Sequence, residues 1–323
     1  MSTPTLPIHS ILPEASTLAY GCMGLGGGWD STPISADDLK LAEVAIETCL
    51  EVGINFFDHA DIYTFGKAEE VFGRVLKGRP ELREKIILQS KGAIRLDQDP
   101  PFYDFSKEWL TTTLDNSLKR LGVEYLDVWL LHRPDPLMDL EEMAETFSEI
   151  QASGKVKHFG VSNMNPSQID FLQQALGGTF VVNQIELSLS RLDWVLEGVM
   201  FDHPKGREVS FTSGTLEYCR KHYIQIQSWG SMANGLFSGK DVSGESESVQ
   251  KTAKLVAELA EKYNTTLEGI VLAFILRHPA RIQPVIGTTN PQRIKNCAAA
   301  LEVSLSRHDW YKLLVSSYGE NMP

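Results

Sequence analysis

The feature that most constrains the fold of this chain is a regular alternation between short apolar runs and longer segments of helical periodicity. The apolar runs lack a clean period-two alternation of polarity, as expected of strands buried on both faces. Eight strands are predicted, at Leu18–Tyr20, Asn55–Phe57, Ile86–Gln89, Tyr125–Leu131, Phe159–Val161, Phe180–Ile185, Ile224–Ser228 and Pro284–Ile286. The intervening segments predict helices over Asp37–Val52, Ala68–Leu76, Lys107–Leu121, Glu141–Ser153, Pro166–Ala175, Ser213–His222 and Leu267–Arg277.

Local signals support the ends of these helices. Ser35 and Ser106 stand just before predicted helices and are followed by acidic residues, which the helix dipole favours there. Asn165-Pro166 and Asn290-Pro291 each place a capping side chain before a proline that can open a helix. Glycines follow four helical stretches as stop signals: Gly53, Gly78, Gly122 and Gly154. Two further helices are expected, over Ser248–Tyr263 and Arg307–Ser317.

Eight strands that are each followed by a helix predict a closed (β/α)₈ barrel of the TIM type. The alternative is an open doubly wound sheet with a second domain, which usually carries G-x-G-x-x-G after its first strand. Here Trp29 stands where the last glycine of that fingerprint belongs, which disfavours the alternative. Residues 1–323 are therefore expected to form one domain, with long loops over the barrel mouth at Leu187–Thr212 and Ser238–Ser248.

Composition excludes several classes of function. The net charge of -12 disfavours nucleic-acid binding, which needs clustered Lys and Arg. No apolar run approaches the ~18 residues of a membrane span, and no Lys or Arg precedes Lys40 to make a signal peptide. No phosphate loop, nucleophile elbow, C-x-x-C or paired-histidine motif occurs, so no metal site is expected. We expect a cytoplasmic enzyme that has no nucleic-acid or membrane partner.

Four titratable residues are expected at the carboxyl ends of neighbouring strands, where catalytic residues of such barrels lie. Asp58 ends the second strand and Tyr63 lies in the loop after it, while Lys91 and His132 end the third and fourth strands. A tyrosine titrates near pH ~10, and a neighbouring ammonium would stabilise its phenolate. A carboxylate would keep that lysine charged, and a histidine could polarise a carbonyl. The quartet predicts a tyrosine acid/base that protonates a developing alkoxide.

Three segments resemble signatures of the aldo-keto reductase family, and the likeness runs from about Gly21 to Ala299. They are residues 53–63 (GINFFDHADIY), 154–163 (GKVKHFGVSN) and 285–291 (VIGTTNP). The resemblance is greatest to bacterial oxidoreductases with a short C-terminal tail. It implies a monomer or weak homo-oligomer that binds NADPH/NADP+ without a dinucleotide-binding sheet and reduces aldehydes or ketones to alcohols. Tyr63 would then be the proton donor, Asp58 and Lys91 its tuning pair, and His132 the residue that orients the small-molecule carbonyl substrate.

The resemblance also implies a set of cofactor contacts. Ser162, Asn163 and Gln184 would bind the nicotinamide carboxamide, and Trp229 would stack on the ring. A loop over 230–236 would embrace the pyrophosphate, although Ser231 and Ala233 replace a common proline and glycine. Arg293 would bind the adenosine 2′-phosphate, although Asn296 and Cys297 stand where Glu and Asn are frequent. The full expected set is Met23, Ser162, Asn163, Gln184, Trp229, Gly230, Ser231, Met232, Gly235, Leu236, Gly287, Thr288, Thr289 and Arg293.

Two other functions remain open from the residues. The chain could be an NADPH-binding redox sensor or regulatory barrel without significant turnover, or an unrelated lyase or isomerase that uses Lys91 as a Schiff-base amine. Substrate specificity is expected to depend on loops whose structure the sequence pattern does not predict. Four aromatic residues in those loops favour an apolar or aromatic substrate: Trp29, Phe102, Tyr103 and Trp194.

Overall fold

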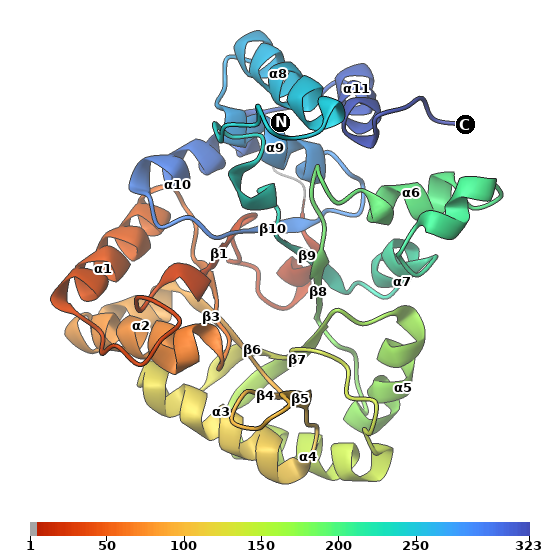
Figure 1. Ribbon diagram of the computed structural model, residues 1–323. Helices are drawn as coiled ribbons and strands as arrows, with labels where there is room; N and C mark the ends of the chain where they lie inside the picture. The colour runs from red at the N-terminus through yellow and green to blue at the C-terminus, as the bar shows by residue number, and fades with distance from the viewer. Residues whose placement is uncertain (1–4) are drawn as a thin grey trace.

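Eight parallel strands close into a barrel in this computed structural model, which describes residues 5–323 (Figure 1). Around the barrel the strands follow the order β1-β10-β9-β8-β7-β6-β3-β2. Their bounds are β1 (Ala19–Gly21), β2 (Phe56–Asp58), β3 (Ile87–Gly92), β6 (Leu126–Leu131), β7 (Val156–Ser162), β8 (Val182–Glu186), β9 (Gln225–Trp229) and β10 (Gln283–Ile286). The predicted (β/α)₈ barrel is confirmed, and the open-sheet alternative is wrong because β1 pairs with both β2 and β10.

A helix follows every barrel strand and lies on the outside of the barrel (Figure 1). These helices are α1 (Ala36–Glu51), α2 (Lys67–Gly78), α3 (Lys107–Leu121), α4 (Leu140–Ser153), α5 (Pro166–Leu176), α7 (Thr215–Lys221), α9 (Leu267–Leu276) and α10 (Pro291–Ala298). The predicted caps form, since Ser35, Ser106, Asn165 and Asn290 each accept a hydrogen bond from a backbone N–H in the first turn. Gly78 differs from expectation, because it is the last residue of α2 and Arg79 is the cap.

The segments expected as long loops contain short elements. The segment 187–212 holds α6 (Asp193–Val199), and the segment 94–105 holds a hairpin of β4 (Ile94–Arg95) and β5 (Phe102–Tyr103). Strands of two residues are too short for an alternating pattern to reveal. Two accessory helices, α8 (Glu247–Lys262) and α11 (Arg307–Tyr318), pack on each other outside the ring. The 3-10 turns are η1 (Pro7–Ser10), η2 (Cys22–Gly24), η3 (Tyr63–Gly66), η4 (Pro80–Lys85), η5 (Pro204–Glu208), η6 (Ala233–Gly235) and η7 (Ala299–Glu302).

The buried apolar side chains of the strands belong to two clusters, one inside the barrel and one between the barrel and the helices. Phe56, Ile87, Val128 and Val182 belong to the smaller cluster, which fills the barrel interior together with residues from the N-terminal segment. Their chain neighbours, such as Phe57 and Leu88, belong to the larger cluster between barrel and helices. Because side chains alternate along a strand, the positions two and four residues beyond each interior residue also face the barrel axis. This alternation determines what lies at the mouth.

No helix within residues 5–323 has the length and apolar character needed to cross a membrane.

Candidate active site

The residues of the expected quartet occupy inward positions at one end of the barrel. Asp58 lies two residues beyond Phe56, Lys91 lies four beyond Ile87, and His132 lies four beyond Val128. Lys91 is the penultimate residue of its strand, and Tyr63 enters from η3. The register of parallel pairing places Asp58 opposite Gln89 and Lys91 opposite Leu130. The period of the strands therefore directs these side chains toward one mouth.

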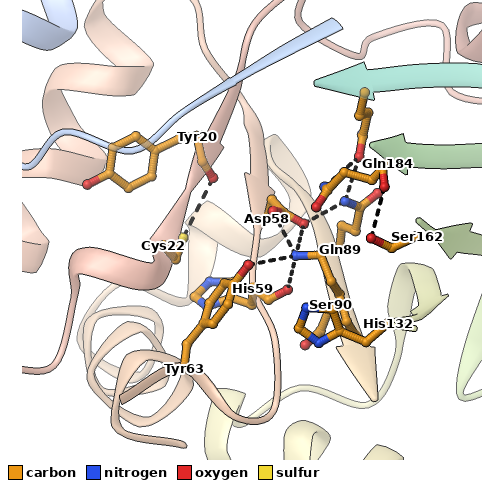
Figure 2. Close-up of polar contacts among 12 residues, drawn as sticks. Tyr20, Cys22, Asp58, His59, Tyr63, Gln89, Ser90, His132, Ser162 and Gln184 are labelled. Atoms are coloured by element: carbon orange, nitrogen blue, oxygen red, sulfur yellow. Dashed lines mark hydrogen bonds and ion pairs between the residues drawn. The ribbon is translucent and has the colours of Figure 1, made fainter. Parts of the chain in front are cut away.

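Lys91 joins the site into one hydrogen-bonded row, of which Figure 2 labels Asp58, His59 and Tyr63. Its fully buried ammonium lies 2.8 Å from the carboxylate of Asp58 and donates to the carbonyl oxygen of His59 at 2.9 Å. The ammonium donates its third hydrogen bond to the Tyr63 hydroxyl oxygen at 3.1 Å. The Tyr63 and His132 rings lie edge to face with their centroids 6.2 Å apart. All three N–H donors of Lys91 are thus engaged, with a carboxylate on one side and a phenol on the other.

The balance of burial and charge sets the protonation of this row. Burial opposes the charge of Lys91, but the Asp58 carboxylate and Tyr63 reverse that effect and raise the pKa of Lys91 above its ordinary value. Burial raises the pKa of Tyr63, and the ammonium of Lys91 opposes this rise without cancelling it. The expected lowering by the ammonium is present, but burial outweighs it. Tyr63 is therefore a neutral phenol at pH 7, held against a cation that would stabilise its phenolate.

His132 is a neutral imidazole in this structure. Burial lowers its pKa well below the ordinary value, and the positive charges of Lys91 and Arg133 lower it further. Its Nδ1 is buried and has no hydrogen-bond partner within residues 5–323. A neutral ring beside Tyr63 can donate an N–H to a carbonyl oxygen without competing for the proton of the phenol.

The side chains expected to hold a carboxamide gather where β7 and β8 end. Ser162 is the last residue of β7, and its hydroxyl donates to the Gln184 carbonyl oxygen at 2.9 Å (Figure 2). Asn163 adopts a left-handed backbone, with φ of 59°, and donates to the Ser162 hydroxyl oxygen at 2.8 Å. The Trp229 indole N–H donates to the amide oxygen of Asn163 at 3.0 Å. Gln184 lies within β8, which extends to Glu186.

The loop over 230–236 is tied to the barrel by a residue that departs from the family pattern. The Ser231 hydroxyl donates to the Val285 carbonyl oxygen at 2.7 Å, a bond that a proline cannot make. Ala233, which stands where glycine is common, has a φ of 48°, a conformation that costs an L-residue about 1–2 kcal/mol. Gly230 and Gly235 also have positive φ, so the loop makes a tight turn beside the mouth.

The remaining expected contacts lie side by side on the β1 and β10 side of the mouth. A Cβ at Gly24 would meet the Thr289 side chain at 3.2 Å, which places the η2 loop and its exposed Met23 next to residues 287–289. Arg293 lies in the first turn of α10, where its guanidinium donates to the Ser238 carbonyl oxygen at 3.0 Å. A helix start with a partly exposed guanidinium and two threonines is a suitable site for a phosphate.

A polar groove of about 330 Å³ opens beside Trp229 and Asn163. Arg133, Glu186, Arg191 and Asp193 line it, and the Arg133 guanidinium lies 5.9 Å from the centre of the Trp229 ring. The aromatic residues expected to favour an apolar substrate do not gather there. Trp194 is 1% exposed and packs against Phe274 and His278 on the outside of the barrel, so its assignment to the pocket is wrong.

Sequence reasoning did not assign roles to several buried polar groups behind the quartet. Glu69 is fully buried; it accepts from the Ser90 hydroxyl at 2.6 Å and from Arg120 at 2.8 Å. His59 is also fully buried, and its ring nitrogens have no partner within residues 5–323. Gln89 contacts Asp58 directly, as described below. Of these residues only Gln89 occupies an inward strand position, and that signal is informative only once the register is known.

Asp61 is expected to make stability depend on pH. Burial, with the nearby charge of Glu69, raises the pKa of Asp61 to about 8. A carboxyl whose pKa is about 3.9 when unfolded then stabilises the fold most at low pH, and this stability is lost as pH rises toward 8. Asp61→Asn should therefore increase the melting temperature more at alkaline than at acidic pH. Thermal unfolding of both proteins across this range checks it, with exposed Asp115→Asn as control. An increase in melting temperature that is the same at every pH would contradict the raised pKa of Asp61.

The comparisons with known proteins identify the family of this chain. The family model described as "Aldo/keto reductase family" matches residues 17–314. The chain is 33% identical over 316 residues to a 6-dehydroglucose reductase from Agrobacterium fabrum, covering 96% of each protein. It is 34% identical over 315 residues to a 6-dehydroglucose reductase from Novosphingobium aromaticivorans, covering 95% of this chain and 93% of the relative.

Solved structures support the same fold. An aldo/keto reductase from Klebsiella pneumoniae, solved in complex with NADP and acetate, superposes with a TM-score of 0.68 at 22% sequence identity. The match covers 96% of this chain and 93% of that one. Since the family model spans most of the barrel and close relatives align over nearly the whole chain, this protein belongs to the aldo/keto reductase family.

Proposed function

We propose that this chain is an NADPH-dependent reductase that converts aldehydes or ketones to alcohols, with Tyr63 as the proton donor. The observation that carries the proposal is the row in which Lys91 donates to both Asp58 and Tyr63 beside a neutral His132. Membership of the family supports carbonyl reduction in general. The roles of the individual residues rest on their geometry. We further propose that residues 1–323 act as one domain.

The residues present fit a nicotinamide cofactor. Ser162, Asn163 and Gln184 supply amide and hydroxyl groups at one point of the mouth, and Trp229 supplies an aromatic face beside them. The helix start at α10 supplies a place for a phosphate. When bound, the reduced nicotinamide supplies the hydride. The Klebsiella pneumoniae neighbour, solved with NADP, supports the choice of cofactor.

The chain's own residues would perform the remaining chemistry. His132 donates a hydrogen bond to the substrate carbonyl oxygen and orients it toward Tyr63. As charge develops on that oxygen, Tyr63 transfers its phenolic proton to it. The ammonium of Lys91, 3.1 Å from the phenolic oxygen, stabilises the phenolate that remains. Asp58 keeps Lys91 charged despite complete burial. The products are an alcohol and an oxidised cofactor, and solvent returns the proton to Tyr63.

The geometry weighs against the Schiff-base alternative. An amine must be neutral and accessible to attack a carbonyl. Lys91 is fully buried, all its N–H donors are engaged, and Asp58 raises its pKa despite the opposing effect of burial. The redox-sensor alternative shares the cofactor but needs no turnover. Its distinguishing result is cofactor binding without consumption.

The proposed function is tested by following NADPH consumption with a panel of aldehydes. We expect turnover to require both a carbonyl compound and the reduced cofactor, with alcohol as the product. Because the groove beside Trp229 is lined by charged residues, polyhydroxylated aldehydes should be better substrates than apolar ones of the same size. The 6-dehydroglucose reductases among the relatives support this class. NADPH binding without consumption by any aldehyde would favour the sensor.

Arg293 is expected to determine preference for NADPH over NADH. Removing a charge-assisted contact to the 2′-phosphate in Arg293→Ala should raise the Kd for NADPH about tenfold or more and leave that for NADH nearly unchanged. Lys295→Ala is the matched control, since Lys295 lies on the same helix and pairs with Glu51. Quenching of tryptophan fluorescence measures both constants. Equal loss of both cofactors in Arg293→Ala would place the phosphate elsewhere.

A further inference from the structure

A hydrogen-bonded chain of glutamine side chains runs through the barrel interior, from the N-terminal segment at Ser16 to Asp58 at the mouth. The Gln89 amide N–H group donates to Asp58 at 2.6 Å and to the amide oxygen of Gln227 at 2.8 Å. The same Gln227 oxygen accepts from Gln184 at 2.9 Å. The Gln227 amide nitrogen donates to Gln283 at 2.9 Å, and Gln283 donates to the Ser16 carbonyl oxygen at 2.7 Å. Of these residues, Figure 2 labels Asp58, Gln89 and Gln184.

The Asp58 carboxylate fixes the direction of every amide in the chain. A carboxylate that is paired with a lysine only accepts hydrogen bonds, so the Gln89 atom against it must be the amide nitrogen. The Gln227 atom next to that nitrogen must then be oxygen, and the Gln184 atom next to the oxygen must be nitrogen. At the far end, the orientation of Gln283 directs its nitrogen at a backbone carbonyl, which also only accepts. The polarity is consistent from one end to the other.

This arrangement is costly where a barrel is normally filled by apolar side chains. Gln89, Gln227 and Gln283 are fully buried, and Gln184 is 2% exposed. Gln89 uses both N–H bonds, which leaves its amide oxygen buried without a partner within residues 5–323. A buried acceptor left unpaired costs about 1–3 kcal/mol. Stability alone therefore does not account for an amide at this buried position.

We propose that Gln227 is a positioning residue whose single amide oxygen holds Gln89 against the catalytic carboxylate and, at the same time, holds Gln184 at the cofactor site. The inference rests on the proposed function, since it takes Asp58 as part of the proton-donating row and Gln184 as a contact of the nicotinamide carboxamide. Gln227 itself hydrogen-bonds to no residue of the quartet within the described chain. It acts through two neighbours, one on the acid/base side and one on the cofactor side.

The consequence for Gln184 is a fixed polarity. Because its amide nitrogen is directed at Gln227, its amide oxygen is the atom left to meet a ligand. Gln184 can then accept from a carboxamide NH₂ group through that oxygen, while its amide nitrogen keeps one N–H beyond the bond to Gln227. Without the Gln227 amide oxygen, the Gln184 amide could rotate. Its contact with the carboxamide would then form for only part of the time.

The consequence for Asp58 reaches Tyr63. The hydrogen bond from the Gln89 N–H group partly neutralises the negative charge of the Asp58 carboxylate. Without that bond, Lys91 and Tyr63 would experience more of this charge. The titratable groups around Tyr63 are Asp58 on β2, Lys91 on β3, Cys22 in η2 and His132 after β6. Of these, Asp58 and Cys22 already raise the pKa of Tyr63 beyond the effect of burial, and Lys91 lowers it. A stronger field from Asp58 would raise the pKa of Tyr63 further.

Gln225 offers a closely matched control. It lies on the same strand, two residues before Gln227, and it too is fully buried. Its amide nitrogen donates to the carbonyl oxygens of Ile226 and Arg281, and its oxygen accepts from the Ile8 N–H. No hydrogen bond links it to Asp58 or Gln184. Gln225→Met and Gln227→Met therefore make the same chemical change at equal burial in one strand.

The experiment compares Gln225→Met, Gln227→Met and Gln89→Met in two assays that need no turnover. The first is the Kd for NADPH from tryptophan fluorescence, and the second is the titration of Tyr63 by ultraviolet difference against Tyr63→Phe. We expect Gln227→Met to weaken NADPH binding about fivefold and to move the Tyr63 titration to higher pH. Gln89→Met should move the titration alone, and Gln225→Met should change neither. In kinetics, the alkaline limb of reduction should follow the titration.

The two failures are distinguishable. Absence of turnover in the unmodified protein would remove the proposed function, and the two binding assays would still judge the inference. A folded Gln227→Met protein that matches Gln225→Met in both assays would overturn the inference, even if the unmodified protein reduces aldehydes. If Gln227→Met does not fold, Gln227→Asn replaces it, because the shorter side chain keeps the amide but withdraws it from both donors. Unchanged binding and titration in that variant would equally refute the proposal.

Discussion

Tyr63→Phe is expected to lower kcat for carbonyl reduction by about 10²- to 10⁴-fold, the range that a positioned general acid contributes. The hydroxyl is the only atom removed, and its structural partner is the ammonium of Lys91 at 3.1 Å. Lys91 keeps its contacts with Asp58 and with the His59 carbonyl oxygen, so the buried charge stays paired. The Kd for NADPH should remain close to that of the unmodified protein, because Tyr63 is not among the expected cofactor contacts.

The measurement combines steady-state kinetics with direct binding of the cofactor. Tyr20→Phe is a useful control, because Tyr20 is a fully buried tyrosine of β1 whose hydroxyl has no partner within residues 5–323. That variant should keep its activity. Turnover by Tyr63→Phe at the rate of the unmodified enzyme would show that another group supplies the proton and would remove the central role given to Tyr63.

Lys91→Met is expected to abolish reduction and to destabilise the fold. The substitution removes the cation that stabilises the phenolate, and it leaves the Asp58 carboxylate, 2% exposed, without its partner. Breaking a buried ion pair from one side costs about 3–5 kcal/mol. We therefore expect a large loss of melting temperature together with loss of turnover. Thermal unfolding and single-turnover kinetics measure the two effects separately.

A double variant separates catalysis from stability. In Asp58→Asn/Lys91→Met the buried negative charge is gone, and the Asn oxygen can still accept from Gln89. Most of the lost stability should return while turnover does not. Recovery of activity in the double variant would contradict the role of Lys91 as the group that stabilises the phenolate. Persistent instability would instead show that the ammonium is needed for folding through its bond to the His59 carbonyl oxygen.

The barrel could be predicted because its signals are local. Each capping side chain that the sequence placed before a helix accepts the expected backbone hydrogen bond, and every predicted strand overlaps an observed one. The elements that escaped prediction are α6 and the β4–β5 hairpin, and Trp194 of α6 packs against Phe274 and His278, which lie far along the chain. Strands of two residues carry too little periodicity to stand out from a polar loop, and α6 lies inside a segment that was expected to be one long loop.

Part of the site could also be predicted, because some of its residues stand at the ends of predicted strands. Asp58 and His132 stand at strand ends that the pattern locates within one residue, and Lys91 stands in a strand that extends three residues beyond its predicted end, so their convergence follows from the barrel itself. Trp194 was misplaced because a loop aromatic gives no sign of which surface it packs on. The pKa of Tyr63 could not be predicted either, since it depends on how far burial outweighs the neighbouring ammonium.

The order of residues alone is sufficient to specify a closed barrel, the strand ends that form its mouth and the four side chains that meet there. It does so because apolar period, capping and turn residues act over a few neighbours along the chain. The packed barrel adds what depends on distance across the interior: a neutral Tyr63 and His132, and a glutamine chain joined to Asp58. Gln89, Gln227 and Gln283 come from three strands far apart in the chain. Their amides acquire a common direction only when closure of the barrel brings them within hydrogen-bonding distance.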